Sequence, residues 1–231
     1  MTKSCLWRVS AIALLLVTAF ASLQGADVTA RQQATPAASC DSAATPTTLM
    51  ATPMPGMDHG GSMGTPAASV EFDQSYIDMM IPHHASIIAL AQAALPRLTD
   101  ERLITLAEDI INAQTAEIDE LRGYREQFYG SPDPMPVDEE AMMRMMGGMS
   151  MSMGEMMAQM DADTQVAIFC ASADPDLAFI DLTVPHHQSA ITASEAALQQ
   201  ATHDEIRSIA ERVIEDQQRE IDELNAIRED L

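Results

Sequence analysis

Apolar residues recur at helical spacing in two long stretches of the chain, residues 69–129 and residues 173–231. In the first stretch one apolar seam advances in steps of four and three along Phe72, Tyr76, Met79, His83, Ile87, Leu90 and Ala94. This is the period of a helix that buries one face. A short turn at 96–99 leads into a second periodic segment, 100–129. Two helices joined by so few residues lie antiparallel, so the pattern predicts an αα-hairpin.

The hairpin pattern occurs twice in the sequence. The segment that begins at Asp78 reads Asp-Met-Met-Ile-Pro-His-His, and 103 residues later the segment that begins at Asp181 reads Asp-Leu-Thr-Val-Pro-His-His. The same offset relates 73–121 to 176–224 without a gap. The sequence therefore predicts an all-α protein, an antiparallel four-helix bundle made of two repeated αα-hairpins. Its two Pro-His-His helices are expected to lie together around a pseudo-twofold axis.

The segments outside the repeats are less regular. Residues 1–21, with a boundary that extends to about residue 30, have the charged start, short apolar run and small-residue cleavage site of a signal peptide. Residues 22–68 are rich in Ala, Thr, Pro, Ser and Gly and predict a disordered tail that contains methionine. Residues 130–172 form a linker rich in Pro and Met. We expect an extracytoplasmic protein, either secreted, periplasmic or in the cell envelope, with an uncleaved signal anchor as the alternative.

Charge narrows the range of partners. The chain of 231 residues carries a formal net charge of −23, which repels nucleic acid and anionic membranes and attracts cations. A solubilising helical surface explains many of the same charges equally well. The sequence contains neither a glycine-rich phosphate loop nor a nucleophile elbow. We therefore expect no nucleic-acid partner and no enzymatic activity.

Two cysteines remain once the signal peptide is removed, Cys40 and Cys170. In an oxidising compartment two thiols in one chain can pair, which would tie the tail to the start of the second repeat. The alternative is that a single cysteine serves as a copper ligand, although no spacing motif supports that role.

Four histidines lie within the apolar seams: His83, His84, His186 and His187. Met79 and Met80 precede the first pair by four residues, so each methionine projects from the same helix face as a histidine. Imidazole combined with thioether selects copper, Cu(I) above all, over zinc, magnesium or calcium. These residues are therefore candidate metal ligands.

A structural role for the histidines is the competing interpretation. Gln114 and Gln217 are polar residues on the seams of the second helices, at the level of the histidines, and Pro82 frees a backbone carbonyl in the first helix. Hydrogen bonds to these groups would let four imidazoles remain in the core without a metal.

The repeated motif resembles a known family. The run from Asp73, Asp-x-x-Tyr-Ile-Asp-Met-Met-Ile-Pro-His-His, followed by a helix with Gln-x-x-Glu-Ile, is similar to the exported bacterial domain-of-unknown-function family 305. The resemblance covers roughly 70–128 and 173–229 and implies a fold similar to the ferritin four-helix bundle. Because some members bind copper outside the cytoplasm, it implies metal ligands at Met79, Met80, His83, His84, His186 and His187. Leu182 and Thr183 replace the methionines in the second unit, whose site is either histidine-only or degenerate.

Further methionines lie outside the repeats and are candidate accessory ligands. In the tail these residues are Met54, Met57, His59 and Met63, and in the linker they are Met145, Met146, Met149, Met151 and Met153. Hydrophobic packing does not account for thioethers on a flexible segment, so both clusters are interpreted as soft-metal catchers. Biased composition in the tail and an adhesive surface in the linker are the alternatives.

These observations predict an exported metal-binding protein that sequesters or delivers copper, with Cu(I) favoured. A copper-receiving protein and a second copy of the chain are the other partners considered. The first alternative function is a non-catalytic structural or interaction bundle with core histidines. The second, a ferritin-like di-metal oxidoreductase, is disfavoured because no Glu lies three residues before any of the histidines.

Overall fold

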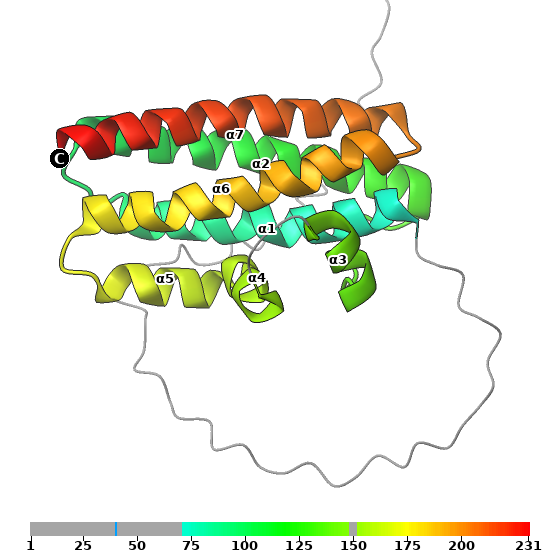
Figure 1. Ribbon diagram of the computed structural model, residues 1–231, viewed down its shortest axis with the longest axis horizontal. Helices are drawn as coiled ribbons and strands as arrows, with labels where there is room; N and C mark the ends of the chain where they lie inside the picture. Colours follow the sequence, from blue (N-terminus) through cyan, green and yellow to red (C-terminus); the bar gives the residue numbers. More distant parts are fainter. Residues whose placement is uncertain (1–39, 41–70, 148–151) are drawn as a thin grey trace, which may run out of the picture. The chain divides into compact units, whose positions relative to one another are not determined.

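The computed structural model describes Cys40, residues 71–147 and residues 152–231. Secondary structure in these parts is entirely helical, which confirms the all-α class (Figure 1). The helices are α1 Phe72–Ala94, α2 Glu101–Tyr129, α3 Glu139–Met146, α4 Met153–Met160, α5 Ala162–Ala171, α6 Pro175–Gln200 and α7 Asp204–Asp230. The tail and the signal peptide, residues 1–39 and 41–70, lie outside the described residues.

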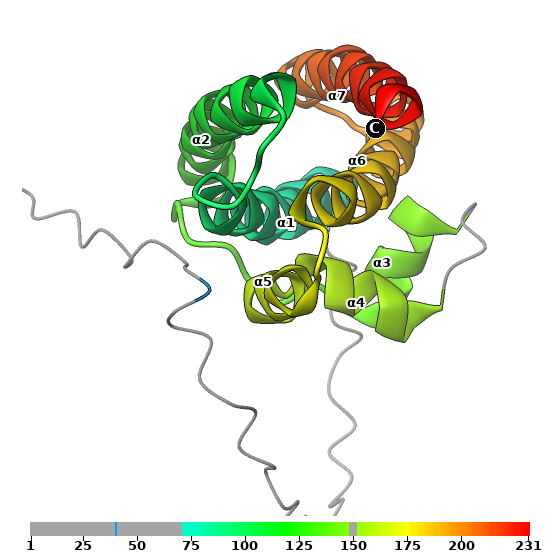
Figure 2. The ribbon, with the colours of Figure 1, turned by 90° about the vertical axis from the view of Figure 1, so that its left-hand side faces the viewer.

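The four long helices, α1, α2, α6 and α7, lie side by side in a bundle (Figure 2). Short turns connect α1 to α2 and α6 to α7, so each repeat is the expected hairpin. Helix α1 packs against both α2 and α6, and α7 packs against both α6 and α2. The two Pro-His-His helices are therefore neighbours, as the repeat predicted. None of the helices in the described parts combines the length and the apolar character needed to cross a bilayer.

Local sequence explains where the long helices begin and end. Asp100 accepts a hydrogen bond from the backbone N–H of Arg102 at the start of α2, and Asp174 caps α6 in the same way, immediately before Pro175. Helix α2 ends at Gly130, whose φ of 80° is a left-handed conformation that glycine adopts without a steric penalty.

Two aspartates at corresponding positions tie the hairpins together. Asp73 in α1 accepts backbone hydrogen bonds from Thr202 at 3.0 Å and from His203 at 2.8 Å, immediately before α7. Its counterpart Asp176 in α6 accepts from the backbone N–H of Thr99 at 2.8 Å, immediately before α2. Burial raises the pKa of the Asp73 carboxyl, but the hydrogen bonds from His203 and Thr202 outweigh burial and hold that pKa below its ordinary value.

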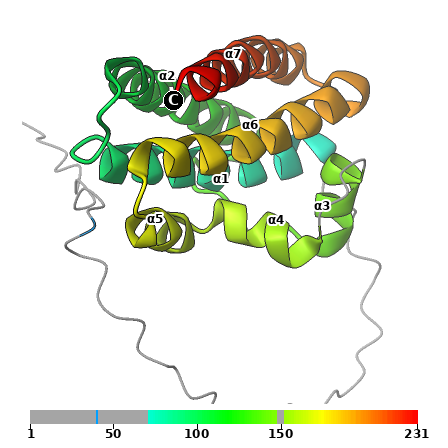
Figure 3. The same cartoon turned by 60° about the vertical axis from the view of Figure 1, so that its left-hand side comes forward.

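The linker contains the three short helices α3, α4 and α5, which lie on the outer side of α1 and α6 (Figure 3). Helix α3 packs against α6 and α1, α4 packs against α1, and α5 packs against both α1 and α6. The linker methionines Met142, Met145, Met146 and Met156 are buried in the same core cluster as Met79 and Met80. The prediction of a flexible linker was wrong for these methionines, because their side chains are held in the core.

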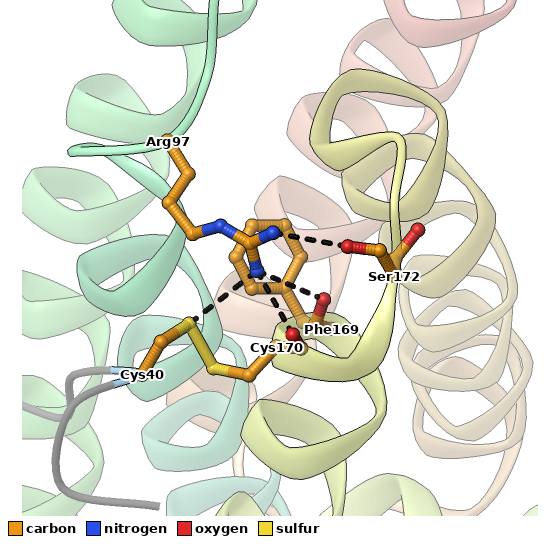
Figure 4. The surroundings of a disulfide bond; sticks show 5 residues. All are labelled: Cys40, Arg97, Phe169, Cys170 and Ser172. Atoms are coloured by element: carbon orange, nitrogen blue, oxygen red, sulfur yellow. Dashed lines mark hydrogen bonds between the residues drawn. A yellow bond between two sulfur atoms is a disulfide. The ribbon is translucent and has the colours of Figure 1, made fainter.

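Cys40 and Cys170 form a disulfide, with their Cα atoms 5.3 Å apart (Figure 4). The Arg97 guanidinium donates to the Cys40 sulfur at 3.6 Å and to the carbonyls of Cys170 and Ser172 at 3.2 and 3.0 Å. It also lies 5.2 Å from the centre of the Phe169 ring. Pairing, one of the two alternatives, is therefore confirmed, and a role for either cysteine as a single copper ligand is wrong.

Candidate metal centre

The Pro-His-His steps of α1 and α6 bring four imidazoles into one cluster inside the bundle. Each of these histidines, His83, His84, His186 and His187, is 0–1% exposed. The ring centres of His83 and His186 are 3.8 Å apart, and within the two sequence pairs the ring centres are 6.1 and 6.2 Å apart. The histidines predicted from the two repeats therefore lie together in one cluster.

One histidine of each pair contacts a carboxylate from the second helix of its own hairpin. His84 Nε2 lies 2.8 Å from Glu117 of α2, and His187 Nε2 lies 2.6 Å from Glu220 of α7. Glu220 is buried, and the side chain of Glu117 is 13% exposed. An ionised carboxylate only accepts hydrogen bonds, so the proton in each contact lies on Nε2.

The other histidine of each pair bonds to a serine of the opposite hairpin. His83 Nε2 lies 2.8 Å from Ser189 Oγ, and His186 Nε2 lies 2.8 Å from Ser86 Oγ. Each hydroxyl donates its own proton to a backbone carbonyl at 2.7 Å, Ser189 to His186 and Ser86 to His83. A hydroxyl has one proton to give, so with that proton on the carbonyl each of these imidazoles donates from Nε2.

The four Nδ1 atoms have no protein partner in the described structure. Each of them is buried. With Nε2 protonated, Nδ1 of a neutral imidazole is the basic nitrogen. An unpaired buried polar group costs about 1–3 kcal/mol. Each ring is held through Nε2 while Nδ1 has no partner. Metal-binding histidines are held in the same way, because the ring nitrogen that does not bind the metal donates to a carboxylate or another acceptor.

Burial also keeps two of these rings neutral. It lowers the pKa of His83 and of His186 well below 6.5, and the charges of neighbouring imidazoles lower both pKa values further. Because the imidazole must be unprotonated to bind a metal, Nδ1 of these two residues is available without releasing a proton at neutral pH.

The glutamines do not have the role that the sequence suggested. Gln114 and Gln217 are buried, but the nitrogen and oxygen of both side-chain amides lack a hydrogen-bond partner in the described structure. The proposed hydrogen bonds between these residues and the histidines are therefore wrong. The carboxylates one turn further along α2 and α7, Glu117 and Glu220, take that role instead. The equal spacing of His84–Glu117 and His187–Glu220, 33 residues each, was a signal in the sequence that could have identified them.

The other predicted ligands lie either in the core or outside the residues that the structure describes. Met79 and Met80 are buried on α1, and Met145 and Met146 are buried on α3. Met153 begins α4, although its side chain is not described. Outside the described residues are Met54, Met57, His59, Met63, Met149 and Met151. Across 71–147 and 152–231, no three His, Cys, Asp or Glu side chains are grouped to hold a metal ion, so a site here would use pairs of imidazoles or thioethers.

Comparison with known families identifies the repeat. The model of a domain of unknown function, DUF305, matches residues 23–125 and again residues 73–228. The chain belongs to the DUF305 family. The second match spans both hairpins of this DUF305 protein, in agreement with the 103-residue repeat, for example from His83 to His186.

Solved structures of similar fold include two metal-bound forms of CopM. CopM in the Cu(II)-bound form is 28% identical with a TM-score of 0.56, and the match covers 68% of this chain and 96% of that chain. CopM in the Cu(I)-bound form is 25% identical with a TM-score of 0.53 and the same coverage. A DUF305 fragment from Deinococcus radiodurans, 24% identical with a TM-score of 0.53 over 72% of this chain and 100% of that chain, shows the shared fold. No curated protein matches the chain.

The two halves of this DUF305 protein contribute equally to the imidazole cluster. Each supplies one carboxylate-bound and one serine-bound histidine, although Leu182 and Thr183 replace the two methionines in the second half. The second half therefore lacks the two thioethers but keeps the hydrogen bonds of its histidines.

Proposed function

We propose that this DUF305 protein binds copper outside the cytoplasm, and that it sequesters or delivers the ion rather than catalysing a reaction. The observation that carries the proposal is the set of four buried Nδ1 atoms that lack a hydrogen-bond partner in the described structure, on rings held in place by hydrogen bonds at Nε2. Imidazole nitrogen suits copper, and thioether sulfur favours Cu(I). Similarity to CopM, whose structures contain Cu(I) or Cu(II), supports the choice of metal.

The residues around the histidines have separate roles in this proposal. Glu117 and Glu220 accept the Nε2 protons, which fixes the rings and makes Nδ1 more basic. Ser86 and Ser189 hold the other two rings from the opposite hairpin, so a bound ion would join the two halves of the bundle. Burial excludes water and strengthens each of these polar contacts.

Export and delivery complete the proposal. The features of a signal peptide at residues 1–21 direct the protein out of the cytoplasm, and the net charge of −23 attracts cations to its surface. Delivery requires a copper-receiving protein outside the cytoplasm. A homodimer remains a prediction.

A competition titration with Cu(I) under reducing conditions tests the proposal. The variant H83Q/H84Q/H186Q/H187Q removes the four Nδ1 atoms, and each glutamine amide can still donate to the Glu or Ser partner of the histidine. Circular dichroism and urea unfolding establish that the variant is folded. If the four-residue variant is unfolded, the pair H83Q/H186Q serves in its place.

The folded variant is expected to lose the tightest Cu(I) site and the stabilisation that Cu(I) gives the wild type. Unchanged Cu(I) affinity in the folded variant would show that the imidazoles are not ligands. Unfolding free energies that do not respond to Cu(I) in either protein would favour the structural bundle.

A further inference from the structure

Methionine is concentrated in one of the two clusters that make up the described core. The cluster around Tyr76 contains six buried methionines, namely Met79, Met80, Met142, Met145, Met146 and Met156. The cluster around Leu103 and Phe179 contains none and is built from Leu, Ile, Ala and Phe. Both clusters pack helices of the same bundle, so helix packing by itself does not account for the difference.

Four of these methionines come from two short helices, α3, which packs against α1 and α6, and α4, which packs against α1. In the same cluster α6 presents the small residues Ala190, Ala193 and Ala197, which leave room for long side chains beside it. Methionine is a flexible residue that specifies packing poorly, and leucine would fill most such positions at a smaller loss of side-chain entropy. The thioether sulfur is the property that leucine cannot supply.

The methionine cluster borders the imidazoles. Ser86 Oγ lies 2.9 Å from the carbonyl of Gln159 in α4 and 2.8 Å from His186 Nε2. One serine hydroxyl therefore contacts both the helix that carries Met156 and the ring of a proposed metal ligand. Soft-metal ligands of two kinds lie on adjacent parts of one core.

The two short helices also offer a route from the surface. Met143 in α3 and Met157 in α4 are each 52% exposed, and each directly follows a buried methionine in the sequence. Helices of eight residues have little stability of their own, so α3 and α4 can separate from the bundle more readily than α1 or α6. An ion held by an exposed thioether can then pass to a buried one on the same helix.

We propose that the methionines of α3 and α4, Met142, Met145, Met146 and Met156, form a second metal site that takes a soft monovalent cation, Cu(I) or Ag(I). This site does not depend on copper binding by the imidazoles. Thioethers carry no proton at physiological pH, so the thioether site holds its ion with the same affinity at pH 7.5 and at pH 5.

Titration of the full mature chain with Ag(I), at pH 7.5 and pH 5, tests the proposal. The variant M142L/M145L/M146L/M156L removes the four sulfurs and keeps the apolar volume, since Leu and Met replace one another well in cores. The matched control M50L/M54L/M57L/M63L removes as many sulfurs from the tail. Native mass spectrometry counts the bound ions, and X-ray absorption at the silver edge reports the silver–sulfur contacts. If the four-residue variant is unfolded, M145L/M146L replaces it.

The core replacements are expected to remove one Ag(I) ion together with its silver–sulfur signal at both pH values, whether the tail keeps its methionines or carries the four leucines. If the core replacements remove no Ag(I) ion in either background, the cluster is packing only. H83Q/H84Q/H186Q/H187Q separates the two proposals, because this histidine variant should retain the ion that gives the silver–sulfur signal even if the imidazoles bind nothing.

Discussion

Replacing Glu117 or Glu220, the carboxylates that contact Nε2 of His84 and His187, should weaken copper binding without removing a proposed ligand atom. In E220Q the glutamine oxygen can still accept from His187 Nε2, but the negative charge 2.6 Å from the ring is lost. Nδ1 of the His187 ring becomes less basic, and the glutamine amide can also rotate so that its NH₂ group faces the ring. Loss of such a hydrogen-bonded partner typically lowers metal affinity about 10–100-fold. This corresponds to about 1.4–2.8 kcal/mol of binding free energy.

The assay is competition for Cu(I) against a chelator of known affinity, with E117Q measured beside E220Q. Because Glu220 is buried and Glu117 is 13% exposed, the effect of E220Q should be at least as large. The control is E223Q, which removes an exposed charge one turn further along α7 and should leave the affinity nearly unchanged. Equal affinities for E220Q, E117Q and E223Q would refute the argument that the carboxylates act through the histidines.

Three further predictions concern stability. R125A breaks the buried ion pair with Asp78 of α1, at 2.5 Å, and should lower the free energy of unfolding in urea by about 3–5 kcal/mol. R228A breaks the exposed counterpart of that pair, with Asp181, and should cost about 0–1 kcal/mol. Equal costs for the two variants would contradict this reasoning. C40S/C170S opens a disulfide that spans 130 residues and should lower the free energy of unfolding by about 2–5 kcal/mol, an effect that a reductant should reproduce in the wild type but not in the variant. D73N should cost about 1–3 kcal/mol at pH 7. Because the folded pKa of Asp73 is lowered, its contribution is present above the ordinary Asp pKa of about 3.9 and is lost as pH falls through the folded pKa, so the two proteins should converge in acid.

The bundle could be predicted because its signals are periodic and repeated. The seam from Phe72 to Ala94 has the helical period, and α1 covers Phe72–Ala94 in the structure. The 103-residue offset placed the second hairpin, and burial of the histidines followed from their position in the seams. These features depend on local spacing, which the sequence contains directly.

The partners of the histidines depend on the reach of side chains from neighbouring helices. Gln114 lies on the seam and looked like the natural partner, yet its amide has no partner in the described structure. Glu117, one turn further at the edge of the buried face, has a side chain long enough to reach His84. The crossed contacts of Ser86 and Ser189 depend on how α1 and α6 meet, which no single-helix pattern contains.

The linker was misjudged for a different reason. Its glycine and proline content and its short segments gave no clear period, so the packing of α3 to α5 on the bundle was not expected. Met145 and Met146 had been interpreted as thioethers on a flexible segment, but tertiary contacts with α1 and α6 bury them. Short helices of this kind are stabilised by the surface on which they pack and have little signal of their own.

Nitrogen-detected NMR of the four core imidazoles, before and after one equivalent of Cu(I), tests the central claim most directly. The metal-free protein is expected to show His83, His84, His186 and His187 protonated at Nε2, the nitrogen through which each ring is hydrogen-bonded. On addition of Cu(I) the Nδ1 resonances should shift while the Nε2 protons remain. Rings protonated at Nδ1, or Nδ1 resonances that do not respond to Cu(I), would contradict the proposal that this cluster is the copper site.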